Sequence, residues 1–352
     1  MTRRRPRLLD AVLIGVLVLI VAGVVVLQVH LHGSSDDAGG SSPSATPTYP
    51  QTSVGNAYPS VTASITPTTA PTPTSPGATA APGAGALQSS LAAQAQSLAA
   101  QQPATFRVAT FNVLGNSHTG GRGDEAARPN GTTRMTRTVA VLRNHDVQVV
   151  GLQEFETVQA KAFTRQMGPA WQIYPNLPGD TRDAIAWRTD AFEVVQEQTV
   201  RVPYFNGSLV DMPIVLLKDR RTGKEVYFFN VHNSADTYKY HHQQANRTSA
   251  MDREVQVIKQ MYGYKIPVIF TGDLNEREPA YCYFTANAPL HAAYGGTNVA
   301  GRCSPPVIGG NTPIDWIFGT PDVTFSAPIF DHSSLVRVAT DHPFYAATVT
   351  LR

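Results

Sequence analysis

Polar residues recur at the ends of short apolar runs in the C-terminal two thirds of this chain. Such runs end at four places, where FRVATF leads to Asn112, VQVVGLQ to Glu154, VYFFNV to His232 and IPVIFTG to Asp273. A fifth run, DWIF, begins with Asp315. A buried strand needs no polar group at its tip, where an unpaired group costs free energy. Because functional residues gather on loops held by a rigid scaffold, the pattern predicts a sheet core with a reactive site along one edge.

The N-terminus carries a membrane-targeting pattern. The first ten residues contain four arginines, and residues 11–29 contain no charge. Nineteen helical residues would span about 29 Å, enough for the hydrocarbon core of a bilayer. We expect residues 1–10 to be cytoplasmic, 11–29 to be an uncleaved transmembrane anchor, and the rest to be exported. A cleaved signal peptide is the alternative, but the following VHLHGSS offers no A-x-A-like cleavage site.

Residues 30–103 are rich in Ser, Thr, Pro, Ala and Gly. Such a composition buries too little apolar surface to offset chain entropy, so we expect a disordered linker. If flexible, it would reach about 45–50 Å on average. Its last segment, LQSSLAAQAQSLAAQQ, has the composition of a marginal helix that Pro103 would end.

Residues 104–352 have the length of one globular domain. Four of the 28 Lys and Arg and three of the 26 Asp and Glu precede residue 104, so the domain is close to neutral, at +1. A strong overall basic footprint for nucleic acid is therefore absent, although a local patch is not excluded. Cys282 and Cys303 are the only cysteines. An even pair in an exported domain favours a disulfide, worth about 3 kcal/mol on the chain-entropy model.

Strand-like runs dominate this domain, and helical periodicity is clearest at 133–144 and 246–262. Each of these helices leads into a strand-like run, and Asn206-Gly207 is a good hairpin turn. The order favours packed mixed sheets with helices outside over a Rossmann or barrel plan. G-x-G-x-x-G, Walker and G-x-S-x-G motifs are absent from the sequence.

Each candidate site residue also has a simpler explanation. Glu154 suits a hard divalent cation, yet it is equally an ordinary solvated acid. Asn112 is equally a turn amide. Asp273, in GDLN, is alternatively an Asp-turn at a strand end. His232 alone is more often a structural hydrogen bonder, and Asp315 either caps its strand or holds an imidazole.

Taken together, six strings resemble the successive motifs of the endonuclease/exonuclease/phosphatase superfamily: TFNVLG, GLQE, NVHN, IFTGDLN, IDWIF and TDHPF. That superfamily includes pancreatic-type deoxyribonucleases, abasic-site endonucleases, inositol polyphosphate phosphatases and neutral sphingomyelinases. The resemblance covers nearly all of 104–352 and implies a four-layer α/β sandwich of two packed mixed sheets with outer helices. The chain departs from the pattern at NVHN, where related sequences often have leucine in place of Asn233.

The resemblance also implies the site residues and the cofactor. It implies Mg²⁺, with Mn²⁺ or Ca²⁺ as alternatives, held by Asn112, Glu154 and Asp341. The catalytic residues that it implies are His232, Asp273, Asn275, Asp315 and His342. His232 would contact the phosphate and support the leaving group. Asp273 and Asn275 would orient the attacking water, and Asp315 would pair with His342, with the base left open between Asp273 and His342.

We therefore expect a metal-dependent phosphodiester hydrolase acting outside the cytoplasm, most simply as a monomeric nuclease. A phosphodiesterase or phosphatase acting on lipid head groups or small phosphoesters is the main alternative, and a membrane anchor would place it near lipid. In that case, Tyr204-Phe205 is a candidate lipid-contacting hairpin. A binding module that reuses the fold without catalysis is a further alternative, because fold alone does not imply activity.

Overall fold

The structure is a computed structural model that describes residues 84–121 and 123–352. The predicted anchor at 11–29 and the predicted linker up to residue 83 lie outside these residues. Among the residues described, no helix combines the length and apolar character that crossing a membrane requires. The linker's alanine- and glutamine-rich end forms helix α2 (Ala84–Gln101), which stops before Pro103.

The domain is built from two six-stranded mixed sheets. The first has the order β13 (Val323–Asp331), β14 (Phe344–Leu351), β1 (Ala104–Asn112), β2 (Val149–Gln153), β4 (Asp183–Arg188) and β3 (Trp171–Tyr174). The second has the order β5 (Phe192–Pro203), β6 (Leu209–Asp219), β7 (Glu225–His232), β8 (Val268–Asp273), β12 (Asp315–Gly319) and β9 (His291–Ala292).

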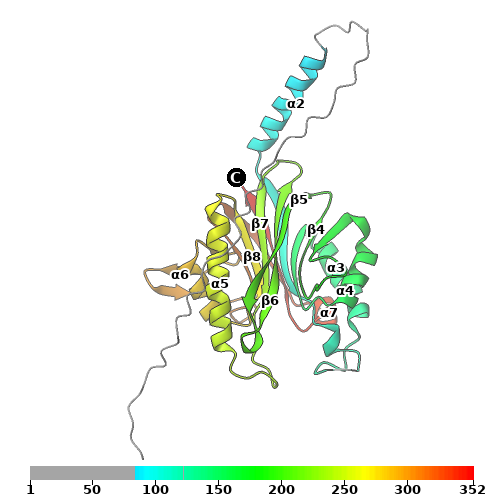
Figure 1. Cartoon of the computed structure of the whole chain (residues 1–352), viewed down its shortest axis with the longest axis vertical. Coiled ribbons are helices and arrows are strands. Elements are labelled where there is room, and N and C mark those ends of the chain that lie inside the picture. Colours follow the sequence, from blue (N-terminus) through cyan, green and yellow to red (C-terminus); the bar gives the residue numbers. More distant parts are fainter. Residues whose placement is uncertain (1–83, 122) are drawn as a thin grey trace, which may run out of the picture. The chain divides into compact units, whose positions relative to one another are not determined.

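Helices cover the outer face of each sheet (Figure 1). The first sheet packs against α3 (Gly131–Asn144), α4 (Thr157–Met167) and α7 (Ser334–Ala339), and the second against α5 (Gln244–Gly263) and α6 (Glu278–Asn287). The sheets meet in a third apolar cluster that includes Trp187, Phe228 and Ile317. Each large apolar side chain buried there contributes about 1.5–3 kcal/mol. The predicted four-layer sandwich is confirmed.

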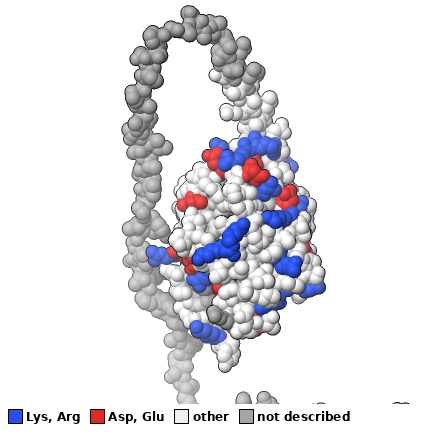
Figure 2. Space-filling view, turned by 90° about the vertical axis from the view of Figure 1, so that its right-hand side faces the viewer, with Lys and Arg blue, Asp and Glu red and all other residues white. Residues whose placement is uncertain are grey.

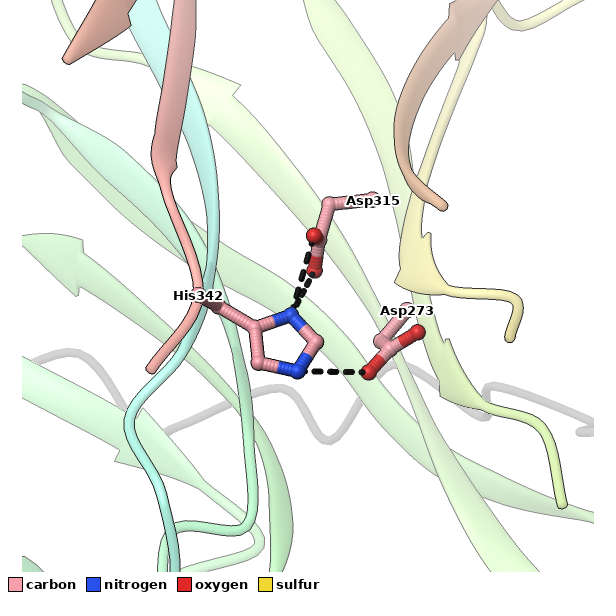
Figure 3. A group of neighbouring side chains, drawn as sticks. All are labelled: Asp273, Asp315 and His342. Carbon is pink, nitrogen blue, oxygen red and sulfur yellow. Dashed lines mark hydrogen bonds and ion pairs between the residues drawn. The ribbon is translucent and has the colours of Figure 1, made fainter. Parts of the chain in front are cut away.

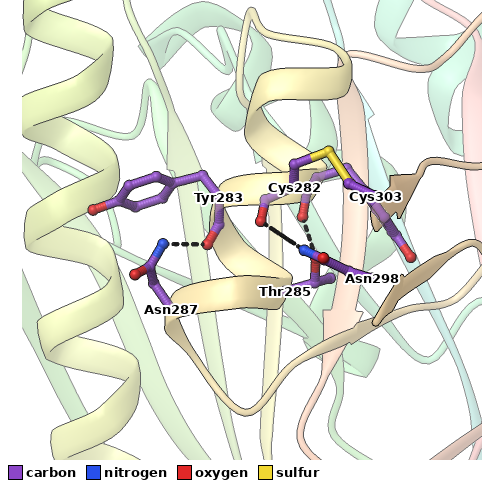
Figure 4. The surroundings of a disulfide bond; sticks show 7 residues. Cys282, Tyr283, Thr285, Asn287, Asn298 and Cys303 are labelled. Atoms are coloured by element: carbon purple, nitrogen blue, oxygen red, sulfur yellow. Dashed lines mark hydrogen bonds between the residues drawn. A yellow bond between two sulfur atoms is a disulfide. The ribbon is translucent and has the colours of Figure 1, made fainter. Parts of the chain in front are cut away.

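The predicted disulfide joins Cys282 of α6 to Cys303 of β11 (Arg302–Ser304). The partner strand of β11 is β10 (Thr297–Val299), and Asn298 in that strand donates hydrogen bonds to the Cys282 carbonyl and to the hydroxyl of Thr285 (Figure 4). A covalent bond and two hydrogen bonds therefore fix this hairpin to α6.

The predicted hairpin at Asn206-Gly207 is also present, between β5 and β6. Both residues have positive φ, of 54° and 74°, the backbone for which Asn and Gly are the favoured residues. Sequence periodicity did not predict three helices, α4, α6 and α7, or four short strands, β3, β9, β10 and β11.

Candidate active site

Strand direction brings the ends of several strands from both sheets to one edge of the sandwich. In the first sheet, β1 and β2 run parallel with Asn112 opposite Gln153, so Glu154 follows at the same edge. In the second sheet, β7 and β8 run parallel with His232 opposite Asp273. Antiparallel β12 then begins at this edge, with Asp315 opposite Asp273.

His342 completes this group from the first sheet. It precedes β14, which runs antiparallel to β1, so the start of β14 lies at the edge where β1 ends. The structure thus brings together six of the eight predicted residues: Asn112, Glu154, His232, Asp273, Asp315 and His342.

Asp273 is the centre of the site. Its Oδ2 accepts a 3.0 Å hydrogen bond from Asn112 Nδ2 and lies 3.6 Å from the Nε2 atoms of both His232 and His342. Its Oδ1 accepts from the backbone N–H of Asn275. Only 1% of Asp273 is exposed, so this buried carboxylate sits between two imidazoles with its orientation fixed.

Asp315 orients His342 (Figure 3). Its two carboxylate oxygens lie 3.2 and 3.0 Å from Nδ1 of His342, while Nε2 faces Asp273. Burial raises the pKa of Asp315 to about 6, although the His342 charge opposes this. Burial would lower the pKa of His342, but the charges of Asp315 and Asp273 raise it well above its ordinary value. At neutral pH the pair is therefore a carboxylate and an imidazolium.

Glu154 offers carboxylate oxygens on the other side of Asn112. Asn112 Nδ2 donates to Oε1 at 3.0 Å, and the Gly115 N–H donates to Oε2 at 2.7 Å. Burial would raise the pKa of Glu154, but the charge of His232 and these two hydrogen bonds lower it. Glu154 is therefore a carboxylate at neutral pH, and each oxygen keeps a lone pair for a hard cation.

The remaining two predicted residues are placed differently. Asn275 follows Asp273, but its side chain donates a 2.8 Å hydrogen bond to the Asn233 carbonyl. Asp341 is exposed, and its Oδ1 accepts a hydrogen bond from Thr340. Direct binding of a metal ion by Asn112 and Asp341 stays a prediction. In the structure the Asn112 amide nitrogen holds the carboxylates of Glu154 and Asp273.

Sequence reasoning missed Asp183, the first residue of β4. It lies opposite Gln153 at the same edge, and its Oδ1 is 3.9 Å from Nδ1 of His232. Burial raises the pKa of Asp183 to about 7 against the charge of His232. The sequence RDAIAWR did offer a signal for this residue. Asp183 opens an apolar run, as Asp315 does. The neighbouring Arg182 pairs with Asp180, and Arg188 lies at the far end of β4.

A buried polar network holds the two sheets together about two residues behind the site. Asn230 of β7 donates to the carbonyls of Leu152 and Ala184, and its Oδ1 accepts from Gln153 and Thr271. Three of these four hydrogen bonds cross between the sheets and fix their separation, and with it the distance between Asn112 and Asp273.

Fold and site together define a class of two-sheet α/β proteins with a carboxylate, amide and imidazole centre at the sheet edge. The sequence profile described as Endonuclease/Exonuclease/phosphatase family matches residues 109–342. The chain belongs to this family, whose members are hydrolases acting on phosphoesters and are typically dependent on divalent metals. None of the curated proteins matches the chain.

Solved structures share the fold at low sequence identity. An endonuclease/exonuclease/phosphatase from Bacteroides vulgatus is 20% identical, with a TM-score of 0.57 over 71% of this chain and 100% of its own. The human Nocturnin catalytic domain with bound sulfate is 16% identical, with a TM-score of 0.54 over 71% and 97%. D. rerio TDP2 complexed with a single strand DNA product is 16% identical, with a TM-score of 0.53 over 70% and 99%.

Proposed function

We propose that this protein is a divalent-metal-dependent phosphodiesterase that cleaves nucleic acid outside the cytoplasm. The observation that carries the proposal is the position of Asp273, hydrogen-bonded to Asn112 and flanked by His232 and His342. Such a buried carboxylate is suited to take a proton from water, and the imidazoles to stabilise charge on a phosphate.

Glu154 is the metal ligand in this proposal. Asp273, Asp315 and His342 also lie close enough together to hold an ion, with ligand atoms within 4.8 Å of one another. Within that group, however, Nδ1 of His342 is already held by Asp315 and Oδ2 of Asp273 by Asn112, whereas both oxygens of Glu154 keep a lone pair. A divalent cation at Glu154 would offset charge on the nonbridging oxygens of the phosphate.

The side chains of this chain then carry the proton transfers. Asp273 accepts a proton from the attacking water, which Asn275 helps to place. The imidazolium of His342, held by Asp315, stabilises the negative charge that develops on the phosphate, and His232 supports the departing oxygen. The raised pKa of His342 favours Asp273 as the base.

Surface charge supports a polyanionic substrate. Helices α3 and α4 contain no acidic residue, and they expose Arg137, Arg143, Lys161 and Arg165. Figure 2 shows that Lys and Arg predominate on this face. Helix α4 begins three residues after Glu154, so its N-terminal end lies beside the site and Lys161 follows one turn later, while Arg143 and Arg165 lie toward the other end of the helices. One of the solved relatives, TDP2, is complexed with a single strand DNA product.

The lipid alternative receives less support from the hairpin at Tyr204-Phe205. Both aromatic side chains are half-buried, and Phe205 stacks on Tyr240 with ring centroids 4.7 Å apart. The rings therefore pack against the domain, whereas a lipid-contacting hairpin would project them.

For location, we propose export with a membrane tether. The arginines before the apolar stretch at 11–29 support it. The disulfide between Cys282 and Cys303 is also typical of an oxidising compartment.

A substrate panel with Mg²⁺ tests the activity: plasmid DNA, RNA, sphingomyelin and inositol phosphates, each with and without chelator. We expect cleavage of nucleic acid that the chelator abolishes. Glu154→Gln should raise the Mg²⁺ concentration needed for half-maximal rate, while Glu156→Gln, whose carboxylate binds Ser117, is the matched control. Full turnover in chelator, or equal metal dependence of the two variants, would contradict the metal assignment.

A further inference from the structure

Tyr204 places an unused hydroxyl beside the site. It follows β5 and lies in the β5–β6 hairpin, with its ring edge-on to that of His232 at 6.0 Å between centroids. Tyr204 is half-buried, and its hydroxyl makes no hydrogen bond to any residue of 84–121 or 123–352. A phenol this close to a catalytic histidine, with its donor unsatisfied, is available to a ligand.

The hairpin and its neighbours hold this ring in place. The backbone N–H of Tyr204 donates to the Ser208 carbonyl at 2.7 Å. Phe205 meets the Tyr204 ring edge-on at 4.5 Å and stacks on Tyr240. Gln243, just before α5, accepts from the Asn206 N–H at 3.0 Å. The ring is therefore fixed from the hairpin side and from the loop before α5, and this preorganisation lowers the entropy cost of using its hydroxyl.

Electrostatics keep this hydroxyl a neutral donor. Burial raises the pKa of Tyr204 well above its ordinary value, and the charges of Asp183, Glu154 and Asp273 raise it further. These carboxylates belong to the site and lie close enough to act on the phenol. A neutral donor among carboxylates neither competes with a cation for Glu154 nor repels an anionic substrate.

We propose that Tyr204 is a further catalytic residue, whose hydroxyl donates a hydrogen bond to a nonbridging oxygen of the scissile phosphate. This inference rests on the proposed phosphodiesterase function. A phosphate bound at His232 would have anionic oxygens within reach of the hairpin, because the Tyr204 ring meets the His232 ring edge-on. The charge of Arg182 also acts on this phenol, but its guanidinium pairs with Asp180, so the hydroxyl supplies a contact that His232 and His342 do not.

Tyr204→Phe tests the role by removing only the hydroxyl. With Mg²⁺ and a diester substrate, kcat/KM should fall about 10- to 100-fold, as expected for losing a hydrogen bond to a charged acceptor. Tyr240→Phe is the matched control, because it removes a hydroxyl from the same aromatic cluster without a contact to His232. Its kcat/KM should stay at the wild-type value, and both variants should unfold at the wild-type temperature.

Inorganic phosphate provides a readout that needs no turnover. Calorimetric titration in Mg²⁺ should show weaker phosphate binding to Tyr204→Phe than to wild type or Tyr240→Phe. Wild-type kcat/KM together with wild-type phosphate affinity in Tyr204→Phe would overturn the role of Tyr204. An inactive wild-type protein would overturn the proposed function instead, and phosphate affinity would still decide for or against Tyr204.

Discussion

Replacing Asp315 by asparagine tests whether a buried carboxylate controls the proton on His342. Both of its oxygens lie within hydrogen-bonding distance of Nδ1, at 3.2 and 3.0 Å, and 1% of Asp315 is exposed. Asparagine keeps the volume but removes the negative charge. The pKa of His342 should therefore fall, because the charge of Asp315 is the largest of those that raise it.

The expected loss of activity follows from the energy of the pair. Removing one partner of a buried ion pair costs about 3–5 kcal/mol. At about 1.4 kcal/mol for each factor of ten, kcat/KM would fall about 10²- to 10⁴-fold if the whole cost is expressed in the transition state. General acid–base catalysis by a positioned side chain contributes the same range, about 10²- to 10⁴-fold.

The assay is kcat/KM against pH with Mg²⁺, across the range in which histidines titrate. The imidazolium is lost as pH rises through the folded pKa, so a lower pKa moves the basic limb to lower pH. The matched control is Asp331→Asn, because Asp331 forms a similar pair with His145, 2.8 Å from its Nε2, and its hydrogen bonds go to His145 and Ser333 and not to the site residues. A folded Asp315→Asn enzyme with a wild-type rate and basic limb would refute the reasoning.

Three further predictions concern stability, each measured by urea unfolding. Burial raises the pKa of Glu254 from 4.5 to about 8. The contribution of its neutral carboxyl to the unfolding free energy is therefore complete below about pH 4.5 and is lost as pH rises through about 8, a loss on the order of 3–5 kcal/mol. Glu254→Gln should escape this loss, and an equal pH dependence of wild type and variant would contradict the prediction. A Cβ at Gly151 would lie 2.2 Å from Thr271 Oγ1. Gly151→Ala should therefore lower the unfolding free energy by about 1–3 kcal/mol or more. An unchanged unfolding free energy would show that the sheets can move apart. Cys303→Ser should lower the unfolding free energy by about 3 kcal/mol because it removes the disulfide to Cys282. Reduced wild-type protein is the comparison, and an unchanged unfolding free energy would exclude a stabilising role of the disulfide.

Much of the site could be predicted from sequence because strand ends are visible locally. Asn112, Glu154, His232 and Asp273 each follow an apolar run, and parallel strands end at the same edge. Seven α-helices and strands escaped because they are short or lack clear apolar periodicity. Helix α6, for example, has Pro279 in its first turn and the pattern EPAYCYFTAN.

Tyr204 and Asp183 needed tertiary information. The acid that opens the apolar run of RDAIAWR marks Asp183 as a candidate, but it reaches the site because β4 runs antiparallel to β2, and nothing within RDAIAWR reports that direction. Tyr204 reaches His232 only through the packing of the β5–β6 hairpin against the loop before α5. Local sequence reports which residues end a strand, whereas strand direction and hairpin placement decide which other residues join them.

The division of the site between two sheets makes catalysis depend on how the sheets pack. Asn112 belongs to the first sheet and Asp273 to the second, yet their side chains are joined by one 3.0 Å hydrogen bond. Behind them, Asn230 bridges the sheets, and Gly151 permits the approach by lacking a Cβ. A small separation at Gly151 would stretch the Asn112–Asp273 bond directly. Turnover should therefore be lost in Gly151→Ala before the protein unfolds, because a misplacement of about 1 Å is enough to cost about 10²-fold in rate.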